Sequence, residues 1–476
     1  MILVFDIGTT FVKGGIVDPD GKVLAKARAP IRSAESADGE GHESDPASWL
    51  SAIGMVTALL GLRDRAGISC VVVSSNGPTL LPVGPDGEPL DLAMTWMDRR
   101  PAEEARVITE VSGSPADASF FLPKALWMAR HKAEIYERAR WLLPCAEYVT
   151  FRLTGEAYRV AANRPFREIF WNEGATEKAG VDPDKLPPFV ETGDPVGIVC
   201  AAASETTGIP SGLPVYAAGA DFLMAIIGTA ATTVGRACDR AGTSEGINLC
   251  WGMPAGDRRL QSAPHIVPGR FNVVGTFSTS GLGLDWLASL TGNPGNYEAL
   301  FSSMDGIPAG SRGLLFLPFL RPERFPLWDP DAKGAFLGLS TRHGRAEMAR
   351  AIVESGGFAA RRILELMEEA GCTAGELRVT GGLARHPAWC QIRADITGKR
   401  ILLPEEEEAE LVGDACVGLT SQGRFQSLAE AAECCVRIRR HFHPRSANRE
   451  VYERMYAAFR SALTSLDNVL PLLDYK

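Results

Sequence analysis

The sequence predicts an α/β protein of two similar lobes, and three observations support this fold class. The 476-residue chain is too long for one hydrophobic core. Strand-length apolar runs alternate with helix-length amphipathic segments in both halves, which is typical of mixed sheets covered by helices. Each half also opens with a hairpin whose tip carries Gly-Thr, at Gly8-Thr9 and at Gly242-Thr243. We expect lobes over 1–236 and 237–476 that face a central cleft.

The first half of the sequence is expected to form an antiparallel strand meander, followed by alternating helices and strands. Asp45 stands directly before an apolar periodic segment, where it can cap a helix. The short run of three valines after Cys70 ends in small polar residues and predicts a buried strand. We expect strands at 2–5, 15–17, 23–27, 70–74 and 213–218, and helices at 46–65, 121–132, 133–139 and 221–231.

The second half repeats this plan. It begins with a hairpin over 237–250, and a long amphipathic helix precedes a strand that runs into two glycines. We expect further strands at 314–317 and 377–380, and helices at 345–370, 388–397, 414–423 and 447–466.

Composition excludes several functional classes. The formal net charge of −9 argues against a nucleic-acid or anionic-membrane surface, although local amides and Mg²⁺ still allow an acidic protein to bind ATP. No uncharged apolar stretch approaches the ~18 residues of a membrane span. The ten cysteines show no metal-ligand or disulfide spacing, and the N-terminus lacks the basic region of a signal peptide. We expect a cytoplasmic protein with free thiols and a small-molecule substrate, and homodimerisation is left open.

The first hairpin is a candidate phosphate and metal site. Gly8 lets the backbone approach an anion, and Thr9 and Thr10 offer hydroxyl donors. Asp6, at the end of the strand, can hold Mg²⁺ directly or through water. The alternative is an ordinary tight hairpin whose threonines satisfy turn amides. Lys13, on the returning strand, is a further candidate for nucleotide binding.

Asp221 is the candidate general base. It follows a buried strand that ends in Ala218-Gly219-Ala220, so a rigid element would hold its carboxylate where a substrate hydroxyl could donate a proton. Local sequence alone favours a simpler role as helix cap.

Three more stretches are candidate binding segments, and each has a structural alternative. Gly242 and Thr243 repeat the first hairpin tip and could hold phosphate, or they form an ordinary turn. Gly381 and Gly382 lead a strand into a helix, where an adenine could lie against backbone, or they form a plain glycine-rich turn. Trp96 and Asp98 could line a polar pocket, or they are a buried tryptophan and a surface Asp-Arg pair.

Taken in order, these motifs resemble the FGGY carbohydrate kinase family over nearly the whole chain. The resemblance lies in the two phosphate hairpins, in the W-x-D-x-R stretch at Trp96, in K-x-L-W at Lys124, and in Y-x-x-x-x-L-T-G-E from Tyr148. It continues through Gly219-Ala220-Asp221, through a W-D-P-x-A-x-G-A-F-x-G-L run at 328–339, and through 381–391 and 413–415.

The resemblance implies two actin/hexokinase-like (ribonuclease H-like) lobes and ATP-dependent phosphorylation of a hydroxyl of a small sugar or polyol, with Mg²⁺. It makes Asp221 the general base and Asp6 the metal-organising acid. The implied nucleotide-binding residues are Gly8, Thr9, Thr10, Lys13, Gly242, Thr243, Gly381, Gly382, His386 and Asp414. The implied substrate-binding residues are Asn76, Trp96, Asp98, Asp221 and Phe222.

Departures from the family pattern concern the acceptor. Xylulokinases carry Gln-Met-His-Gly and glycerol kinases Asn-Gln-Arg-Glu where this chain has Ser75-Asn76-Gly77-Pro78, so a polar substrate contact is missing. Phe222 stands where a polar residue is common, which predicts a more apolar or smaller pocket. His386 replaces the usual Ser or Asn. Two other hypotheses remain at this point: a nucleotide-binding regulator on the same fold, and a sugar-binding module without nucleotide.

Overall fold

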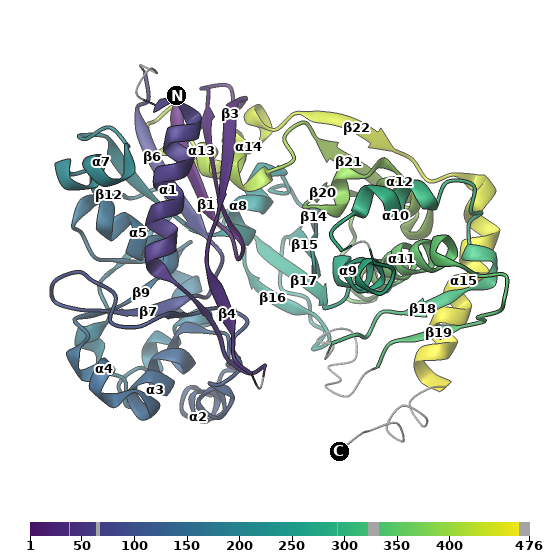
Figure 1. Cartoon of the computed structure of the whole chain (residues 1–476), viewed down its shortest axis with the longest axis horizontal. Helices are drawn as coiled ribbons and strands as arrows, with labels where there is room; N and C mark the ends of the chain where they lie inside the picture. Colours follow the sequence, from purple (N-terminus) through teal and green to yellow (C-terminus); the bar gives the residue numbers. More distant parts are fainter. Residues whose placement is uncertain (38, 63–66, 293, 322–332, 466–476) are drawn as a thin grey trace. The chain divides into compact units, whose positions relative to one another are not determined.

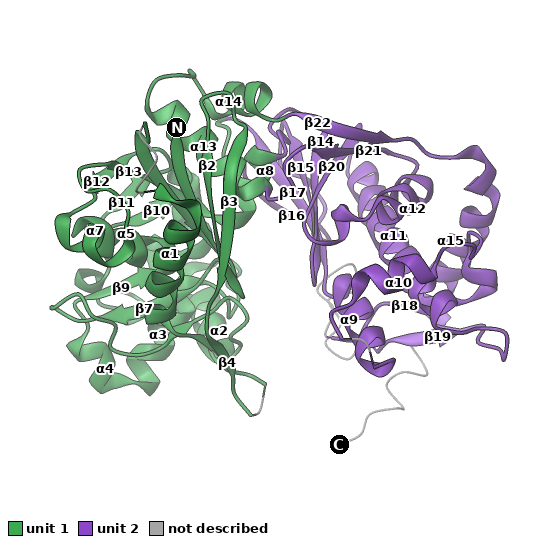
Figure 2. Ribbon diagram, turned by 45° about the horizontal axis from the view of Figure 1, so that its top comes forward, with its two compact units in different colours: residues 1–228, 266–268, 409–436 green, residues 229–265, 269–408, 437–476 purple. Residues whose placement is uncertain are grey.

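The computed structural model describes residues 1–37, 39–62, 67–292, 294–321 and 333–465. The chain forms two compact units, shown in Figure 2. Unit 1 comprises residues 1–228, 266–268 and 409–436, and unit 2 comprises residues 229–265, 269–408 and the chain from 437 onward. The sequence-based division placed 409–436 in the second lobe, whereas this segment packs within unit 1.

The central sheet of unit 1 has six strands in the order β12-β13-β6-β1-β2-β3. The strands β1, β2 and β3 form the expected antiparallel meander, and β6 and β13 run parallel to β1. Every residue of β1 and β6 is buried, as expected for central strands covered on both faces. The bounds are β1 Ile2–Ile7, β2 Phe11–Val17, β3 Val23–Pro30, β6 Cys70–Ser75, β12 Pro195–Ile198 and β13 Pro214–Ala220.

Alternation along β1 decides which helix its side chains meet. Leu3, Phe5 and Ile7 join the hydrophobic core that includes helix α1 (Pro46–Leu60). Ile2 lies on the other side of the strand, next to Gly418 of helix α13 (Ala409–Ser421). Asp6 shares the face of Ile2, since successive side chains point to opposite faces of a sheet. The alternation therefore directs Asp6 toward α13.

The other helices of unit 1 follow the sequence with shifted ends. Helix α1 stops at Leu60 because Gly61 adopts a left-handed conformation, five residues before the expected end. Helix α13 begins at Ala409, five residues earlier than expected, and α8 ends at Gly228. The bounds are α2 Ala102–Ser112, α3 Phe121–His131, α4 Ala133–Arg138, α5 Cys145–Thr154, α6 Arg167–Phe170, α7 Ala201–Thr207, α8 Asp221–Gly228 and α14 Leu428–Cys435.

Unit 1 also contains smaller sheets that border the candidate site. A five-stranded sheet has the order β4-β5-β8-β7-β9, and β10 pairs with β11 in parallel. The bounds are β4 Ser33–Glu35, β5 His42–Ser44, β7 Leu80–Val83, β8 Ala93–Met94, β9 Trp141–Pro144, β10 Arg159–Ala161 and β11 Phe189–Glu191. Among the described residues of unit 1, 3₁₀ turns lie at 164–166, 173–175 and 183–185.

Unit 2 repeats the strand directions of unit 1. Its seven-stranded sheet has the order β16-β17-β15-β14-β20-β21-β22, in which β14, β15 and β17 are antiparallel neighbours and β20 and β21 run parallel to β14. The bounds are β14 Arg236–Ala241, β15 Glu245–Trp251, β16 Gln261–Pro264, β17 Phe271–Phe277, β20 Glu376–Thr380, β21 Arg400–Pro404 and β22 Ile438–Phe442.

Helices α9 to α12 and α15 complete unit 2, and Figure 1 labels them. Their bounds are α9 Gly281–Leu290, α10 Tyr297–Ser303, α11 Arg345–Glu369, α12 Pro387–Thr397 and α15 Ser446–Ser465, with β18 Leu315–Leu317 paired to β19 Ala335–Leu337 and 3₁₀ turns at 311–313 and 383–385. The first residues of the W-D-P run, 328–332, lie outside the described residues.

All ten cysteines are free, as expected. Among the residues that the structure describes, no helix is both long and apolar enough to cross a membrane.

Candidate active site

Unit 1 gathers acids around Asp6, of which Glu410 and Asp414 are buried and Asp221 is half-buried. Asp6 is only 2% exposed, and the Lys13 Nζ lies 3.4 Å from its Oδ2. The same ammonium lies 3.7 Å from Glu410 Oε2. The Ser74 hydroxyl, on β6, donates to Asp414 Oδ2 at 2.8 Å. We call Asp6, Asp221, Glu410 and Asp414 the acid cluster.

The electrostatics of the acid cluster favour binding of a cation. The pKa of Asp6 is raised to about 7, mainly by burial; Lys13 opposes this shift, and the charges of Glu410 and Asp221 add to it. Burial also raises the pKa of Asp414 well above its ordinary value, and Asp6 adds to the effect. The acids therefore interact with one another.

Close helix packing brings these acids together. A Cβ on Gly228 of α8 would lie 1.8 Å from the carbonyl oxygen of Ala409, and one on Gly413 of α13 would lie 2.1 Å from that of Met224. Only glycine allows α8 and α13 to approach this closely. Asp221 begins α8, and Glu410 and Asp414 lie on α13, so this contact assembles the cluster.

The donor set of the acid cluster fits Mg²⁺, which prefers carboxylate oxygen and water ligands. Asp414 Oδ1 is buried and lacks a hydrogen-bond partner among the described residues. Within the same residues, no three His, Cys, Asp or Glu side chains are grouped closely enough to hold a metal ion by themselves. Coordination partly through water and phosphate is the usual mode for this ion.

The first hairpin tip is held in place by two side chains. The Asn76 amide donates to the carbonyl oxygens of Ile7 and Gly8, at 2.9 Å each, and its Oδ1 accepts from the Thr79 hydroxyl. The Trp96 indole donates to Thr9 Oγ1 at 3.2 Å. Asn76 and Trp96 therefore support the loop. Their contact with substrate stays a prediction. Thr10 is exposed at the tip.

Asp98 is turned away from any solvent-accessible surface. It is fully buried, and its carboxylate accepts hydrogen bonds from the Arg100 guanidinium and from the backbone amides of His42 and Arg100. The structure thus gives this carboxylate intramolecular partners, and its contact with substrate stays a prediction. It anchors the segment that carries Trp96.

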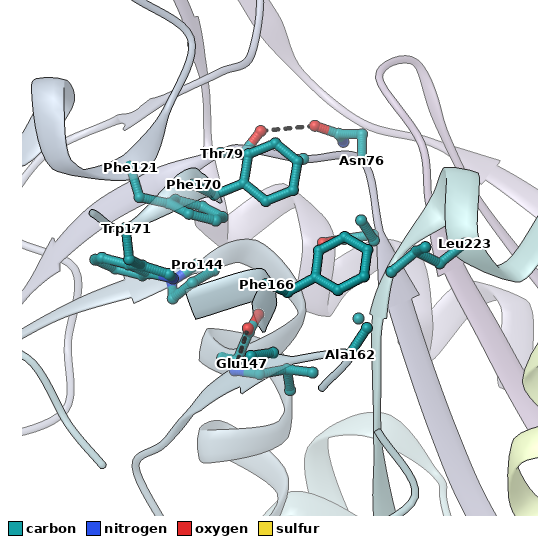
Figure 3. A pocket seen from close by; sticks show the side chains of 16 residues that line it. Asn76, Thr79, Phe121, Pro144, Glu147, Ala162, Phe166, Phe170, Trp171 and Leu223 are labelled. Atoms are coloured by element: carbon teal, nitrogen blue, oxygen red, sulfur yellow. Dashed lines mark hydrogen bonds between the residues drawn. The ribbon is translucent and has the colours of Figure 1, made fainter. Parts of the chain in front are cut away.

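A pocket opens beside Asp221, within unit 1 (Figure 3). Its empty space is about 520 Å³, a volume that includes solvent at its open mouth. Gly219 and Ala220, the two residues before Asp221, line it, and Phe222 contacts the lining residue Phe170 with ring centroids 6.4 Å apart. We call this cavity the acceptor pocket. Its lining is Ser75, Asn76, Gly77, Thr79, Phe121, Pro144, Glu147, Val160, Ala161, Ala162, Phe166, Phe170, Trp171, Gly219, Ala220 and Leu223.

Glu147 is the acid among the described lining residues of the acceptor pocket, and no sequence motif pointed to it. It is 6% exposed, and its Oε1 accepts from the backbone amide of Val160 at 3.0 Å. Burial raises its pKa to about 7, although Arg159 opposes this shift. The signal in the sequence was weak: an acid beside Tyr148 in a helix that is otherwise mostly apolar.

In unit 2, the second hairpin tip is fixed by helix α9. The carbonyl oxygen of Gly242 accepts from the amide of Gly281, and that of Thr243 accepts from the amides of Ser280 and Leu282, at 2.9–3.1 Å. The Gly242 amide donates to Ser244 within the turn. The start of α9 therefore holds the tip rigid.

The glycine pair of unit 2 has two different environments. Gly381 has φ +94°, and a Cβ there would lie 2.5 Å from the carbonyl oxygen of Ala241, so this position needs glycine for the approach of two backbones. The Cβ position of Gly382 meets no atom within 4 Å. His386 stacks on Phe301 with ring centroids 3.9 Å apart, and burial lowers its pKa. Phe301 was missed because it is 85 residues away in the sequence.

Asp414 has a different location from the one expected. It was grouped with the adenosine motif, but it lies in unit 1 beside Ser74, whereas Gly381, Gly382 and His386 lie in unit 2. We include Asp414 in the acid cluster, and its contact with nucleotide stays a prediction.

Two sheets with the same strand directions, each with a Gly-Thr hairpin at its centre, define the actin/hexokinase-like fold of many phosphotransferases. Models of the N- and C-terminal domains of the FGGY family of carbohydrate kinases match residues 1–228 and 240–421. The chain belongs to the FGGY family, and it is a carbohydrate kinase.

Individual relatives agree with this assignment. The xylulose kinase of Bacillus subtilis (strain 168) is 28% identical over 97% of this chain and 96% of its own length. The gluconokinase of the same organism is 25% identical over 100% of this chain and 98% of its own length. The crystal structure of xylulose kinase from Rhodospirillum rubrum has a TM-score of 0.83 at 26% identity, covering 98% of this chain and 99% of that one. Gluconate kinase from Lactobacillus acidophilus shares the fold, with a TM-score of 0.86 at 22% identity and 99% of each chain covered.

Proposed function

We propose that this kinase transfers the γ-phosphoryl group of ATP to a hydroxyl of a small sugar or polyol, with Asp221 as general base. The observation that carries the proposal is the position of Asp221. It follows directly after two residues that line the acceptor pocket, and its charge acts on Asp6. The base, the metal-organising acid and the pocket thus belong to one region of unit 1.

Phosphoryl transfer depends on positioning and charge neutralisation. Asp221 would accept the proton of the acceptor hydroxyl as the new P–O bond forms, while the bond to the leaving ADP breaks. Asp6 would orient Mg²⁺, which when bound neutralises the phosphate charges. Thr9, Thr10 and Lys13 would contact the phosphates at the tip beside Gly8.

In unit 2, we assign nucleotide binding to the second hairpin and to the glycine pair. Gly242 and Thr243 would present the second phosphate tip. Gly382 leaves open space for a flat ring, and the stacked pair of His386 and Phe301 offers an aromatic neighbour for adenine. Gly381 would keep this turn close to the hairpin.

Relatives named xylulose kinase and gluconokinase support the reaction class, and members of the family use ATP as phosphate donor. At 24–28% identity they support no single acceptor. We also propose a cytoplasmic location, supported by ten free cysteines, which are usual in a reducing compartment.

Replacement of Asp221 tests the proposed function. The Asp221→Asn variant keeps the shape of the side chain but removes the base, so ADP release with a responsive acceptor should fall by about 10²–10⁴-fold. Asp20→Asn is the matched control, because the Asp20 carboxylate is exposed and pairs with Arg424 at the surface of unit 1. Turnover of Asp221→Asn within tenfold of the wild type would contradict the proposal.

A further inference from the structure

The walls of the acceptor pocket are mostly aromatic and aliphatic. Phe121 stacks on Trp171 with ring centroids 4.6 Å apart, and Phe170 meets Phe121 edge-on at 6.4 Å. Phe166 stacks on Phe170 at 6.5 Å. Figure 3 shows these rings side by side around the cavity. Side chains of small or aliphatic residues complete the wall: Pro144, Val160, Ala161, Ala162, Ala220 and Leu223.

Most polar side chains of the lining already have partners. Both amide hydrogens of Asn76 are donated to backbone carbonyls, and Thr79 donates its hydroxyl hydrogen to Asn76. Ser75 Oγ accepts from the amide of Ala146. These groups hold the loop and helix α5, so they offer little to a ligand with many hydroxyl groups.

Two polar groups retain capacity for a ligand. Glu147 uses Oε1 for the Val160 amide, and a carboxylate has lone pairs for further donors. The Trp171 indole Nε1 is buried and has no hydrogen-bond partner among the described residues. Since buried donors are nearly always bonded, this one suggests a ligand oxygen. The acceptor pocket therefore offers one acceptor and one donor within a largely apolar wall.

An extensively hydroxylated sugar suits such a pocket poorly. Each hydroxyl that leaves water without a partner costs about 5- to 150-fold in affinity. A methyl or methylene group in the same place gains affinity through burial against the aromatic rings. The pocket wall should therefore bind an alcohol with methyl or methylene groups more tightly than its fully hydroxylated counterpart.

We propose that the acceptor is a partly deoxygenated alcohol, namely a small sugar or polyol with a methyl or methylene segment that packs on Phe166 and Phe170 and a hydroxyl that donates to Glu147. The proposal rests on the proposed function, because the acceptor pocket is taken to hold the phosphorylated alcohol. It names the substrate class of that site.

Matched pairs of alcohols test the substrate class. The pairs are 1-deoxy-D-xylulose with D-xylulose, L-fucose with L-galactose, L-rhamnose with L-mannose, and propane-1,2-diol with glycerol. We expect kcat/KM to favour the deoxy member by about tenfold or more in the responsive pair, which corresponds to one unpaired hydroxyl. Equal or better use of the fully hydroxylated members would overturn the proposal.

A variant of the wall tests which residues carry the preference. Phe170→Ala should reduce the preference for the deoxy member at least fivefold, since it removes apolar contact area. Phe425→Ala is the matched control, because Phe425 contacts Arg424 in another part of unit 1 and does not line the pocket. An unchanged preference in Phe170→Ala would contradict the assignment.

Glu147→Gln tests the polar contact separately. Glutamine retains an oxygen for the Val160 amide, so the unfolding midpoint without ligand should be unchanged. Loss of the charged acceptor should raise KM for the deoxy acceptor by about 10- to 100-fold. An unchanged KM would show that Glu147 supports only the fold.

Calorimetric binding of the same pairs, without nucleotide, separates the two proposals. A deoxy ligand that binds but is never phosphorylated would contradict the proposed function and support the substrate class. Phosphorylation of fully hydroxylated alcohols with equal or better efficiency would support the proposed function and contradict the substrate class. Absence of binding by every deoxy member would overturn the substrate class.

Discussion

The hairpins β1–β2 and β14–β15 have the same backbone arrangement but carry side chains of opposite charge near their tips. Their tips are Gly8-Thr9-Thr10 and Gly242-Thr243-Ser244, and each hairpin lies beside a parallel strand, β6 in unit 1 and β20 in unit 2. Two residues before the glycine, unit 1 has Asp6 and unit 2 has Arg240. The two hairpins therefore share a backbone arrangement, whereas the side chain two residues before the tip glycine is negatively charged in unit 1 and positively charged in unit 2.

Buried charges around the two tips differ in the same way. Unit 2 buries two acids, Asp239 and Glu245, beside Arg393. The arginine Nη2 lies 2.5 Å from Glu245 Oε1, and its Nε lies 3.7 Å from Asp239 Oδ2. Ser280 donates to the other oxygen of Glu245. In unit 1, Lys13 lies near Asp6 and Glu410, and the charge of Asp6 acts on Asp414. We infer that the acids of unit 2 stabilise the fold, whereas those of unit 1 serve catalysis at some cost in stability.

The largest expected effect is on Asp6. Asp6→Asn should lower kcat by about 10²–10⁴-fold, because loss of metal orientation removes several kcal/mol of transition-state stabilisation. At pH 8 its unfolding midpoint without ligand should stay the same or rise, since one buried charge is removed. Steady-state kinetics and thermal unfolding check the two halves of this prediction. An Asp6→Asn variant that is active but less stable would show that Asp6 stabilises the fold. It would contradict the inferred difference between the acids of the two units.

The reverse pattern is expected for Arg393. Arg393→Met leaves Asp239 and Glu245 buried without their cation, which should lower the free energy of unfolding by about 3–5 kcal/mol. Denaturant titration measures this loss. The control Arg259→Met removes an exposed pair of the same unit, and its unfolding midpoint should not change measurably. A small effect in Arg393→Met would show that the acids of unit 2 do not depend on this pair.

A smaller effect is expected where helices α8 and α13 meet. Gly413→Ala places a Cβ against the Met224 carbonyl, so it should cost about 1–3 kcal/mol of stability and move Glu410 and Asp414 away from Asp6. We expect kcat to fall more than substrate affinity. Gly174→Ala is the control, because its Cβ position is open and its φ is ordinary. Full activity in Gly413→Ala would mean that the helix contact does not set the catalytic geometry.

The smallest expected effect is on pH dependence. The pKa of folded Asp6 is raised to about 7, above its ordinary 3.8, so the folded state binds a proton more strongly than the unfolded chain. Stability from this group is present at low pH and is lost as the pH rises from about 4 to about 7. The stability advantage of Asp6→Asn over the wild type should therefore grow between pH 5 and pH 8. Denaturant titrations of both proteins at pH 5 and pH 8 measure this difference in the free energy of unfolding. A difference that does not change with pH would contradict the raised pKa of Asp6.

Sequence alone was sufficient for features whose chemistry is local. The two tips, the acid at the end of β1 and the strand before Asp221 are contiguous motifs, and the family, the α/β fold and the kinase class were confirmed by the comparisons. The roles of the individual site residues stay predictions.

Features formed by distant segments could not be predicted. The acceptor pocket combines residues from 75 to 223, and its aromatic wall comes largely from the irregular segment around Phe166 and Phe170. The partners of Asn76 and Asp98 are backbone groups and an arginine that only tertiary contact reveals. Likewise, nothing local indicates that Asp414 packs within unit 1, because that depends on the glycine contact between α8 and α13.

The central claim is that the acid cluster of unit 1 binds the catalytic cation. The most direct measurement is the rise in unfolding midpoint that Mg²⁺ adds to ADP alone at pH 8, in the wild type, in Asp6→Asn and in the surface control Asp20→Asn. We predict a saturable rise in the wild type and in the control, and its near disappearance in Asp6→Asn. An equal rise in all three proteins would contradict the claim.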